Sequence, residues 1–322
     1  MTQKTLILTL LAPRLSADVI TEVDELIADQ GLSVEQRDWL AGRALPEGGL
    51  PPHGACIEFR LQGDNVDIES LREKALALAA LLGVDLAVQE DSIWRNQRRL
   101  VCFDMDSTLI KAEVIDELAR RNGVFEEVAA VTERAMRGEL DFKQSFRERM
   151  AKLEGLDEEV LLEIADNLPL MDGVERLMRH LKRLGYYTVI LSGGFSYFAR
   201  YLQNKLGFDE IHANELVVVN GRVTGEVREP IVDAERKAML LQDIAEREGL
   251  SLEQTVAVGD GANDLKMLGV AGQGIAYRAK PLVQRQARQS ISTLGLDAVL
   301  YLLGHRQDDL QDKHMPGTAR RD

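Results

Sequence analysis

Short apolar runs that end in Asp, Ser or Gly alternate with helix-forming segments over the last two thirds of the chain. The runs are RLVCFD, YYTVILSGG, QTVAVGDG and GQGIAY, which begin at Arg99, Tyr186, Gln254 and Gly272. Continuous apolarity is typical of strands that are buried on both faces. Strands of this kind in alternation with helices predict an α/β fold with a parallel sheet.

The polar residues that end these runs are expected to meet at one edge of the sheet. Ligands of open α/β sheets bind beyond the carboxyl ends of the strands. The residues placed there by the pattern are Asp104, Asp106, Ser192, Gly193, Asp260 and Asp264. Two carboxylates as close as Asp104 and Asp106 repel each other, and each is costly to bury without a partner. Either this loop is acidic and solvated, or a cation lies between the two.

Length and charge narrow the classes of protein. The chain has 322 residues, enough for two domains, and a net charge of −14. Partners such as nucleic acids and anionic membranes require a basic face, so we expect neither. Cys56 and Cys102 are too few for a disulfide framework. No apolar run reaches the roughly 18 residues of a membrane span, and TLILTLLAP near the start predicts a strand rather than a signal peptide. We therefore expect a cytoplasmic protein.

The chain is predicted to form two domains. Elements over residues 1–92 follow the order βαββαβ of a ferredoxin-like domain, with a helix that starts after Ser16. Such a fold leaves one sheet face and the edge strands uncovered, so we expect this domain to mediate a homodimer. A second domain is predicted over residues 93–304, with a helical cap at about residues 116–169. The polar residues 305–322 are expected to be disordered.

Four motifs occur in a distinctive order: DMDST, LSGG, a lysine in DAERKAML, and GDGANDLKM. With them, residues from about 100 to 303 resemble the phosphatases of the haloacid dehalogenase (HAD) superfamily. The segments AEVIDELA, GELDFKQSFRERM and LSGGF are similar to the phosphoserine phosphatases within it. The first domain resembles the ACT-type domains fused to bacterial members. The implied fold class is α/β, a HAD-type Rossmann-like parallel sheet with a helical cap, preceded by a ferredoxin-like (ACT-like) βαββαβ domain.

The resemblance implies Mg²⁺-dependent hydrolysis of O-phospho-L-serine to L-serine and phosphate, the last step of serine biosynthesis. Asp104 is expected to be the nucleophile that forms an aspartyl-phosphate. Asp106 is expected to protonate the leaving oxygen and then to activate water. Mg²⁺ prefers oxygen ligands. By resemblance these are the Asp104 carboxylate, the main-chain carbonyl of Asp106, and Asp260, with Asp264 orienting the site or binding through water.

Phosphate contacts are expected from three further segments. Ser192 and the Gly193 N–H lie where a strand is predicted to give way to a helix, which favours anion binding. Lys237 supplies a positive charge and Asn263 a neutral donor. The acidic GDGAND segment can also be read as a calcium-type loop, but the glutamate that an EF-hand requires at loop position twelve is missing.

Substrate choice is expected to come from the cap. Glu113 is expected to pair with a substrate ammonium, and Arg149 to bind a carboxylate. Composition alone favours Arg149 as a solvated helix charge, whereas the similarity of DFKQSFRER to the family favours it as a ligand, with Arg147 as the nearest competitor. Met136 and Phe142 are expected on the apolar side of the pocket, which is compatible with packing of the cap helices.

Two alternatives remain open from the sequence. One keeps the phosphatase but gives it another phosphorylated amino acid or a small phosphomonoester as substrate. The other is an amino-acid-sensing regulator with an inactive phosphatase fold. The presence of Asp104, Asp106, Lys237 and Asp260 argues against the regulator.

Overall fold

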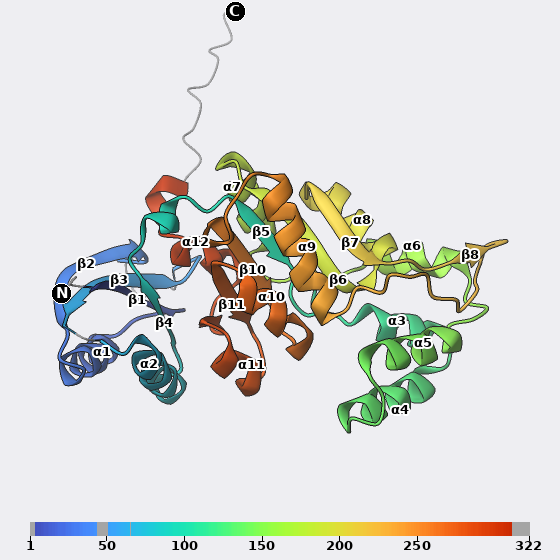
Figure 1. The fold of residues 1–322 in the computed structure, drawn as a ribbon, viewed down its shortest axis with the longest axis horizontal. Helices are drawn as coiled ribbons and strands as arrows, with labels where there is room; N and C mark the ends of the chain where they lie inside the picture. Colours follow the sequence, from blue (N-terminus) through green and yellow to red (C-terminus); the bar gives the residue numbers. More distant parts are fainter. Residues whose placement is uncertain (1–3, 44–50, 65, 311–322) are drawn as a thin grey trace, which may run out of the picture.

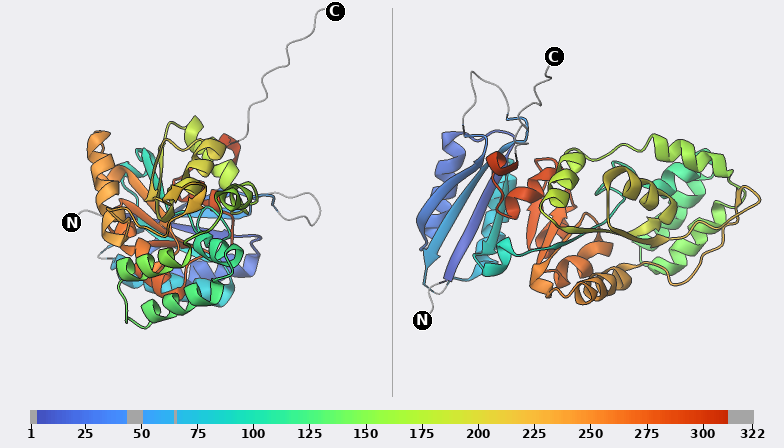
Figure 2. Two further views of the ribbon diagram at one scale, coloured as in Figure 1. Left: turned by 90° about the vertical axis from the view of Figure 1, so that its right-hand side faces the viewer. Right: turned by 90° about the horizontal axis from the view of Figure 1, so that it is seen from above.

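The computed structural model describes residues 4–43, 51–64 and 66–310. These residues form two sheets side by side, with a helical cap beyond the second sheet (Figure 1). Seen from above, the N-terminal sheet, the central sheet and the cap follow one another along the molecule (Figure 2). Within this described part, every helix is too short or too polar to cross a bilayer.

The first sheet is antiparallel, with the strand order β2-β3-β1-β4, and two helices cover one of its faces. The side chain of Ser16 accepts a hydrogen bond from the Val19 N–H at 3.3 Å, so the first helix begins where the sequence predicts. This arrangement confirms the ferredoxin-like prediction. Its elements are β1 (Lys4–Ala12), α1 (Ala17–Asp29), β2 (Ser33–Ala41), β3 (Ala55–Gly63), α2 (Ile68–Leu82) and β4 (Asp85–Glu90).

The other face of this sheet is covered by the C-terminal end of the same chain. Leu11, Cys56 and Ala87 point away from α1 and α2 and belong to the same buried cluster as Tyr301 and Leu302. The expectation of an uncovered sheet face is therefore wrong. The expectation considered the first domain by itself. In the folded chain, apolar side chains such as Tyr301 and Leu302 pack on the sheet face that a second copy of the protein was expected to cover.

Polar contacts also join the two sheets. The Asp85 carboxylate, at the start of β4, accepts hydrogen bonds from the Ser292 N–H at 2.8 Å and from the Thr293 N–H and hydroxyl at 2.9 and 2.7 Å. Arg95, in the connection between the sheets, forms a buried ion pair with Glu58 of β3. A shared core together with paired buried charges makes the N-terminal sheet an integral part of the molecule.

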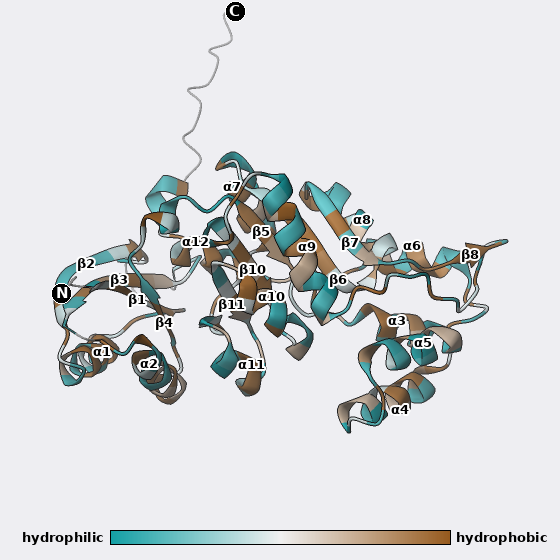
Figure 3. Cartoon of the chain, viewed as in Figure 1, coloured by the Kyte–Doolittle hydropathy of each residue, from teal (hydrophilic) through white to brown (hydrophobic). Residues whose placement is uncertain are grey.

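The second sheet is parallel, with the order β12-β11-β10-β5-β6-β7. Its inner strands β5, β10 and β11 are largely apolar, as their brown colour shows, whereas the edge strand β7 is more polar (Figure 3). The strands are β5 (Leu100–Phe103), β6 (Tyr187–Phe195), β7 (Glu210–Asn214), β10 (Thr255–Gly259), β11 (Gln273–Tyr277) and β12 (Gln289–Ile291). The α-helices around it are α7 (Val174–Arg183), α8 (Ser196–Leu206), α9 (Ala234–Arg247), α10 (Leu265–Val270), α11 (Pro281–Gln286) and α12 (Val299–Leu302).

A helical insertion between β5 and α7 forms the cap. Its helices start at Val114, two residues before the predicted boundary, and the last of them ends at Asp166. A short hairpin between β7 and α9 is also part of the cap. The sequence analysis did not predict it, because its two strands have only two residues each. These elements are α3 (Val114–Arg121), α4 (Phe125–Met136), α5 (Phe142–Lys152), α6 (Glu158–Asp166), β8 (Val218–Val219) and β9 (Arg222–Val223).

The end of the chain differs from the expectation in part. Gln307–Leu310 form a short 3₁₀ helix, and Leu310 is buried in the core beside α12. The prediction of disorder is therefore wrong for residues 305–310, because one apolar residue in a polar stretch is enough to anchor it. Residues 311–322, which the prediction also covered, lie outside the described residues.

Candidate active site

Two neighbouring strands bring the acidic residues together. β5 ends at Phe103, and β10 pairs with it in parallel, with Phe103 opposite Val258. The Asp104 N–H continues this ladder by donating to the Val258 carbonyl at 2.9 Å. Asp104 and Asp260 therefore lie at the same edge of the sheet, where the sequence predicts them.

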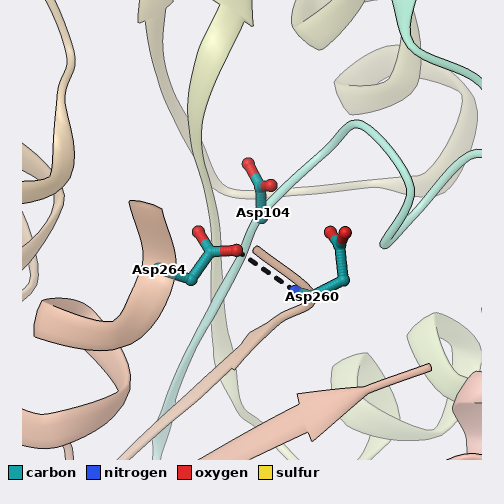
Figure 4. Close-up of side chains that lie close together, drawn as sticks. All are labelled: Asp104, Asp260 and Asp264. Atoms are coloured by element: carbon teal, nitrogen blue, oxygen red, sulfur yellow. Dashed lines mark hydrogen bonds between the residues drawn. The ribbon is translucent and has the colours of Figure 1, made fainter. Parts of the chain in front are cut away.

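Asp104, Asp260 and Asp264 form a compact cluster. One carboxylate oxygen from each residue lies within 4.8 Å of those from the other two, and Figure 4 shows the three side chains together. Asp264 holds the loop that follows β10, because its Oδ2 accepts hydrogen bonds from the Asp260 and Gly261 N–H groups at 3.1 and 2.9 Å. The Thr108 hydroxyl donates to Asp260 at 2.9 Å. Two of the three carboxylates are thus fixed by neighbours from the surrounding loops.

Lys237 supplies a cation to this cluster. Its Nζ, completely buried on α9, lies 2.6 Å from Asp104 Oδ1 and 2.7 Å from Asp264 Oδ1. Burial alone lowers the pKa of a lysine, but these two carboxylates raise the pKa of Lys237 overall. Burial, followed by repulsion from Asp264, raises the pKa of Asp104 well above its usual range. One lysine faces three carboxylates, so the cluster keeps an excess of negative charge.

Asp106 points away from this cluster. Its Oδ1 accepts a hydrogen bond from the Val114 N–H at the start of α3 at 2.9 Å. A Cβ atom on Gly194 would lie 2.4 Å from its Oδ2, so only glycine fits at that position. Burial, with a smaller contribution from repulsion by Glu113, raises the pKa of Asp106 to about 7. The metal contribution expected of Asp106 was its main-chain carbonyl, and its side chain is directed elsewhere.

The LSGG segment lies within β6, at an irregularity in the pairing of this strand with β7. The Gly194 N–H donates to the Ser192 hydroxyl oxygen at 2.9 Å, which leaves the Ser192 proton available to another acceptor. The strand continues to Phe195 and α8 starts at Ser196, so the predicted change from strand to helix comes later than expected. Asn214, which the sequence analysis missed, donates to the Gly193 carbonyl at 2.8 Å and accepts from the Val232 N–H at 2.8 Å.

A cavity of about 470 Å³ lies between the cap and the sheet edge. The predicted residues Asp104, Asp106, Glu113, Arg149, Met136, Phe142, Gly193, Asp260 and Asn263 line it. Ser192, Lys237 and Asp264 are fully buried beneath this wall. Met136 stands at the rim, with 72% of its surface exposed. The structure thus gathers the predicted site residues in and directly behind one cavity.

Glu113 and Arg149 face the cavity from two helices of the cap. Glu113 immediately precedes α3, and its Oε1 accepts a hydrogen bond from the Ser107 hydroxyl at 2.8 Å. Arg149 lies on α5, where its Nε donates to the Ser145 carbonyl at 3.4 Å. The competing residue Arg147 pairs with Glu229 outside the cavity.

Several residues of the site had no role in the sequence reading. Ser107 and Thr108 belong to the DMDST motif, which therefore already contained the signal for both. Ser107 adopts a positive φ of 58°, uncommon for a residue with a side chain, and this places its hydroxyl beside Glu113. Ser145 lies within the DFKQSFRER segment but was given no role, and Asn214 lies in no motif, since its contacts arise only in the folded chain.

Comparisons with known proteins agree with this geometry. The profile of the haloacid dehalogenase-like hydrolases matches residues 101–269. A phosphoserine phosphatase of Streptomyces coelicolor is 42% identical over 305 residues, which are 95% of this chain and 72% of that protein. The crystal structure of a probable phosphoserine phosphatase from Vibrio cholerae is similar with a TM-score of 0.72 and 35% identity, over 94% of this chain and 86% of that one.

A third similarity concerns a reaction intermediate. A solved structure described as a phospho-aspartyl intermediate analogue of phosphoserine phosphatase is 40% identical, with a TM-score of 0.60, over 64% of this chain and 98% of that one. The matched profile covers half of the chain, and the Streptomyces relative is similar over nearly all of it. The chain belongs to the phosphoserine phosphatase family of the haloacid dehalogenase-like hydrolases.

Proposed function

We propose that this chain hydrolyses O-phospho-L-serine to L-serine and inorganic phosphate. The observation that carries the proposal is that one cavity contains both a set of groups for phosphoryl transfer and a pair of opposite charges. Asp104 and Asp106 lie at its sheet side, and Glu113 and Arg149 on its cap side. A phosphorylated amino acid has a phosphate at one end and an ammonium and a carboxylate at the other.

The acidic cluster fits a divalent metal ion. Three carboxylates share one lysine, and burial together with repulsion from Asp264 raises the pKa of Asp260 to about 7. Hard oxygen ligands at a partly open site suit Mg²⁺, which we propose is held by Asp104, the Asp106 carbonyl and Asp260, with Asp264 behind them. When bound, Mg²⁺ supplies positive charge to the phosphoryl oxygens.

Asp104 is the proposed nucleophile. Lys237 holds one of its oxygens at 2.6 Å and partly offsets the rise in the pKa of Asp104 that burial and Asp264 cause. The other oxygen attacks phosphorus, the bond from phosphorus to the serine oxygen breaks, and an aspartyl-phosphate forms. The Ser192 hydroxyl and the Gly193 N–H are proposed to bind phosphoryl oxygens, and Asn263 donates from the loop after β10.

Asp106 is the proposed general acid and base. A pKa of about 7 means that its carboxyl group is protonated in a large fraction of molecules at neutral pH. It can therefore donate a proton to the departing serine oxygen. In the second step the resulting carboxylate takes a proton from the water that attacks the aspartyl-phosphate, which restores both aspartates and releases phosphate.

Recognition of the amino acid is assigned to the cap. We propose that Glu113, held by Ser107, pairs with the substrate ammonium and that Arg149 binds the carboxylate. Met136 and Phe142 then enclose the apolar part of the pocket. This set of charges favours phosphoserine over a simple phosphomonoester, which offers nothing for Glu113 or Arg149 to bind.

The domain organisation, the oligomeric state and the location are further proposals. We propose a regulatory and dimer-forming first domain over residues 1–92, a phosphatase domain over residues 93–304, and a homodimer. The covered face of the first sheet removes one surface for pairing, but no strand among the described residues pairs with the outer edge of β2. We also propose a cytoplasmic location, which is consistent with two buried, unpaired cysteines, Cys56 and Cys102.

The test is phosphate release from a panel of substrates. Purified protein is incubated with phosphoserine, phosphothreonine and p-nitrophenyl phosphate, each with Mg²⁺ and with a chelator. We expect phosphoserine to have the highest kcat/KM and the chelator to abolish turnover, with recovery on addition of Mg²⁺. A preference for p-nitrophenyl phosphate, or full activity in the chelator, would contradict the proposal.

A further inference from the structure

Some side chains of helix α5 face the cavity, and others contact the domain that contains the parallel sheet. Phe142 and Arg149 line the cavity. Lys143 and Arg147, one helical turn apart, instead reach across to the segment that precedes α9. Both are about half exposed. The same helix thus carries the residues that touch the substrate and a second pair that touches that domain.

The second pair meets two acidic residues of the domain that contains the parallel sheet. Lys143 Nζ lies 3.2 Å from Asp233 Oδ2, and Arg147 pairs with Glu229. Asp233 also caps α9, because its side chain accepts from the Arg236 N–H at 2.9 Å. The other oxygen of Glu229 accepts from the Ile231 N–H at 3.1 Å. Main-chain N–H groups of their own segment therefore hold Asp233 and Glu229 in place, independently of the cap.

The C-terminal end of α5 is held differently. After the helix, the Gly155 N–H donates to the Val223 carbonyl at 2.8 Å, and the Val223 N–H donates to the Leu156 carbonyl at 2.9 Å. A Cβ atom on Gly225 would lie 3.2 Å from Ala151 Cα, so the chain beyond the hairpin passes close to the helix. The C-terminal end of α5 is thus anchored by main-chain bonds, whereas its N-terminal half packs through the buried Phe146 and meets the segment before α9 through the half-exposed Lys143 and Arg147.

Phe142, the first residue of α5, lies next to Gly193 in the LSGG segment. Its ring Cζ lies 3.1 Å from the place that a Cβ atom on Gly193 would occupy. The first residue of α5 therefore contacts the segment that is proposed to bind phosphate. An outward movement of the N-terminal half of α5 would widen the cavity beside Gly193, and it would separate Lys143 and Arg147 from their partners.

We infer that Lys143 and Arg147 are positioning residues that hold α5 closed over bound substrate through Asp233 and Glu229. The inference rests on the proposed function for its substrate. Exposed ion pairs contribute little free energy each, which suits a contact that breaks and re-forms in every turnover. Salt screens such pairs, so the strength of the closed state depends on ionic strength.

The experiment reverses the charges of one pair. Wild type, Arg147→Glu, Glu229→Arg and the double variant Arg147→Glu/Glu229→Arg are compared by steady-state phosphate release from phosphoserine at low and high salt. Hydrogen–deuterium exchange of residues 142–147 gives a readout that needs no activity. Arg121→Glu is the matched control, because Arg121 forms an exposed ion pair with Glu163 inside the cap. Lys143→Ala tests the second pair with a milder change.

We expect Arg147→Glu to raise KM for phosphoserine by about two- to fivefold at low salt, with kcat within about twofold of wild type. The difference fades at about 0.5 M salt, and exchange of residues 142–147 becomes faster. The double variant restores both KM and exchange, and Arg121→Glu changes neither. If Arg147→Glu matches wild type, or the double variant stays as impaired as the single one, the inference is wrong. Absence of phosphoserine hydrolysis in wild type refutes the proposed function, while the exchange data still decide on the contact.

Discussion

Glu113 and Arg149 are the residues on which the proposed substrate depends. Both line the cavity, and neither takes part in the cluster around Lys237. A change at Arg149 can therefore separate recognition of the amino acid from phosphoryl transfer. It also tests directly the alternative that the enzyme acts on small phosphomonoesters in general.

We expect Arg149→Ala to lower kcat/KM for phosphoserine by about 30-fold or more, since truncating one member of a desolvated charge pair costs about 2 kcal/mol or more. Hydrolysis of p-nitrophenyl phosphate, which has no carboxylate for Arg149, should change by less than about threefold. Steady-state assays on both substrates measure the difference. Arg121→Ala, also a cap arginine but outside the cavity, is the control. Equal losses on the two substrates would give Arg149 a structural role.

The motifs predicted which residues lie around the cavity, but not the residues that hold them in place through hydrogen bonds. Asp104 and Asp260 were predictable because strand ends in a parallel sheet share one edge. Thr108, which donates to Asp260, and Asn214, which links the Gly193 carbonyl to the Val232 N–H, were not. Thr108 lies in the DMDST motif, but the motif does not show that its partner is Asp260, which is distant in the sequence. Asn214 lies in no motif, and its spacing to Gly193 and Val232 indicates no contact.

Among the elements, β7 and α9 are joined by a small charged network. Glu210 of β7 pairs with Arg247 of α9 and accepts hydrogen bonds from the Tyr187 hydroxyl and His212 Nε2 at 2.9 and 2.6 Å. The hydrogen bond from Arg247, the largest cause, helps lower the pKa of Glu210 to about 2. The folded pKa lies below that of an unfolded glutamate, so this contribution to stability is complete above about pH 4.5 and is lost as the pH falls toward 2.

We expect Glu210→Gln to reduce the free energy of unfolding at pH 7 by about 1 kcal/mol, a value typical of partly exposed pairs. The difference from wild type should shrink as the pH falls below about 4.5 toward 2, because Glu210 of the unfolded chain then binds a proton while Glu210 of the folded chain is still ionised, and this favours unfolding. Urea unfolding at several pH values measures it. Glu226→Gln, on the hairpin connection, is a control with no expected effect. A difference that stays constant over this range would show that the charge of Glu210 does not stabilise the fold.

Helix and strand positions were largely predictable, with errors that have local causes. Ser16 and the apolar spacing behind it gave the start of α1, and a side-chain cap is found there. The LSGG glycines suggested a break in the strand, yet β6 continues to Phe195. Its neighbour β7 explains this, because Asn214 pairs with Phe195 beyond the irregularity at the glycines.

In the whole molecule, the N-terminal sheet and the rest of the chain share one core. The fold class of each part was predictable from the sequence, but not that residues near the end of the chain would cover the first sheet. Tyr301 and Leu302 read simply as apolar helix residues, and no pattern in the sequence shows which surface such residues will cover. Removal of the first 92 residues would expose both of them together with Leu310.

A single substitution tests this interface more gently than truncation. Asp85→Ala leaves the Ser292 and Thr293 N–H groups without their acceptor, so we expect a loss of about 1–3 kcal/mol in the free energy of unfolding. The kcat of the folded enzyme should stay within about twofold of wild type, since Asp85 is remote from the cavity. Urea unfolding and phosphate release check the two parts, with Asp64→Ala as the exposed control. Unchanged stability would mean that the two sheets are joined more loosely than the structure shows.

In the proposed reaction, Asp104 carries the phosphoryl group during hydrolysis of phosphoserine. Asp104→Asn replaces the attacking oxygen with an amide while it preserves shape, and Asp243→Asn, on the exposed side of α9, is the matched control. The measurement is phosphate release from phosphoserine in the presence of Mg²⁺, with mass spectrometry of the quenched protein. We predict that Asp104→Asn abolishes turnover and that a phosphorylated peptide containing Asp104 appears only in wild type and the control. Turnover by Asp104→Asn at a rate near that of wild type would contradict the account.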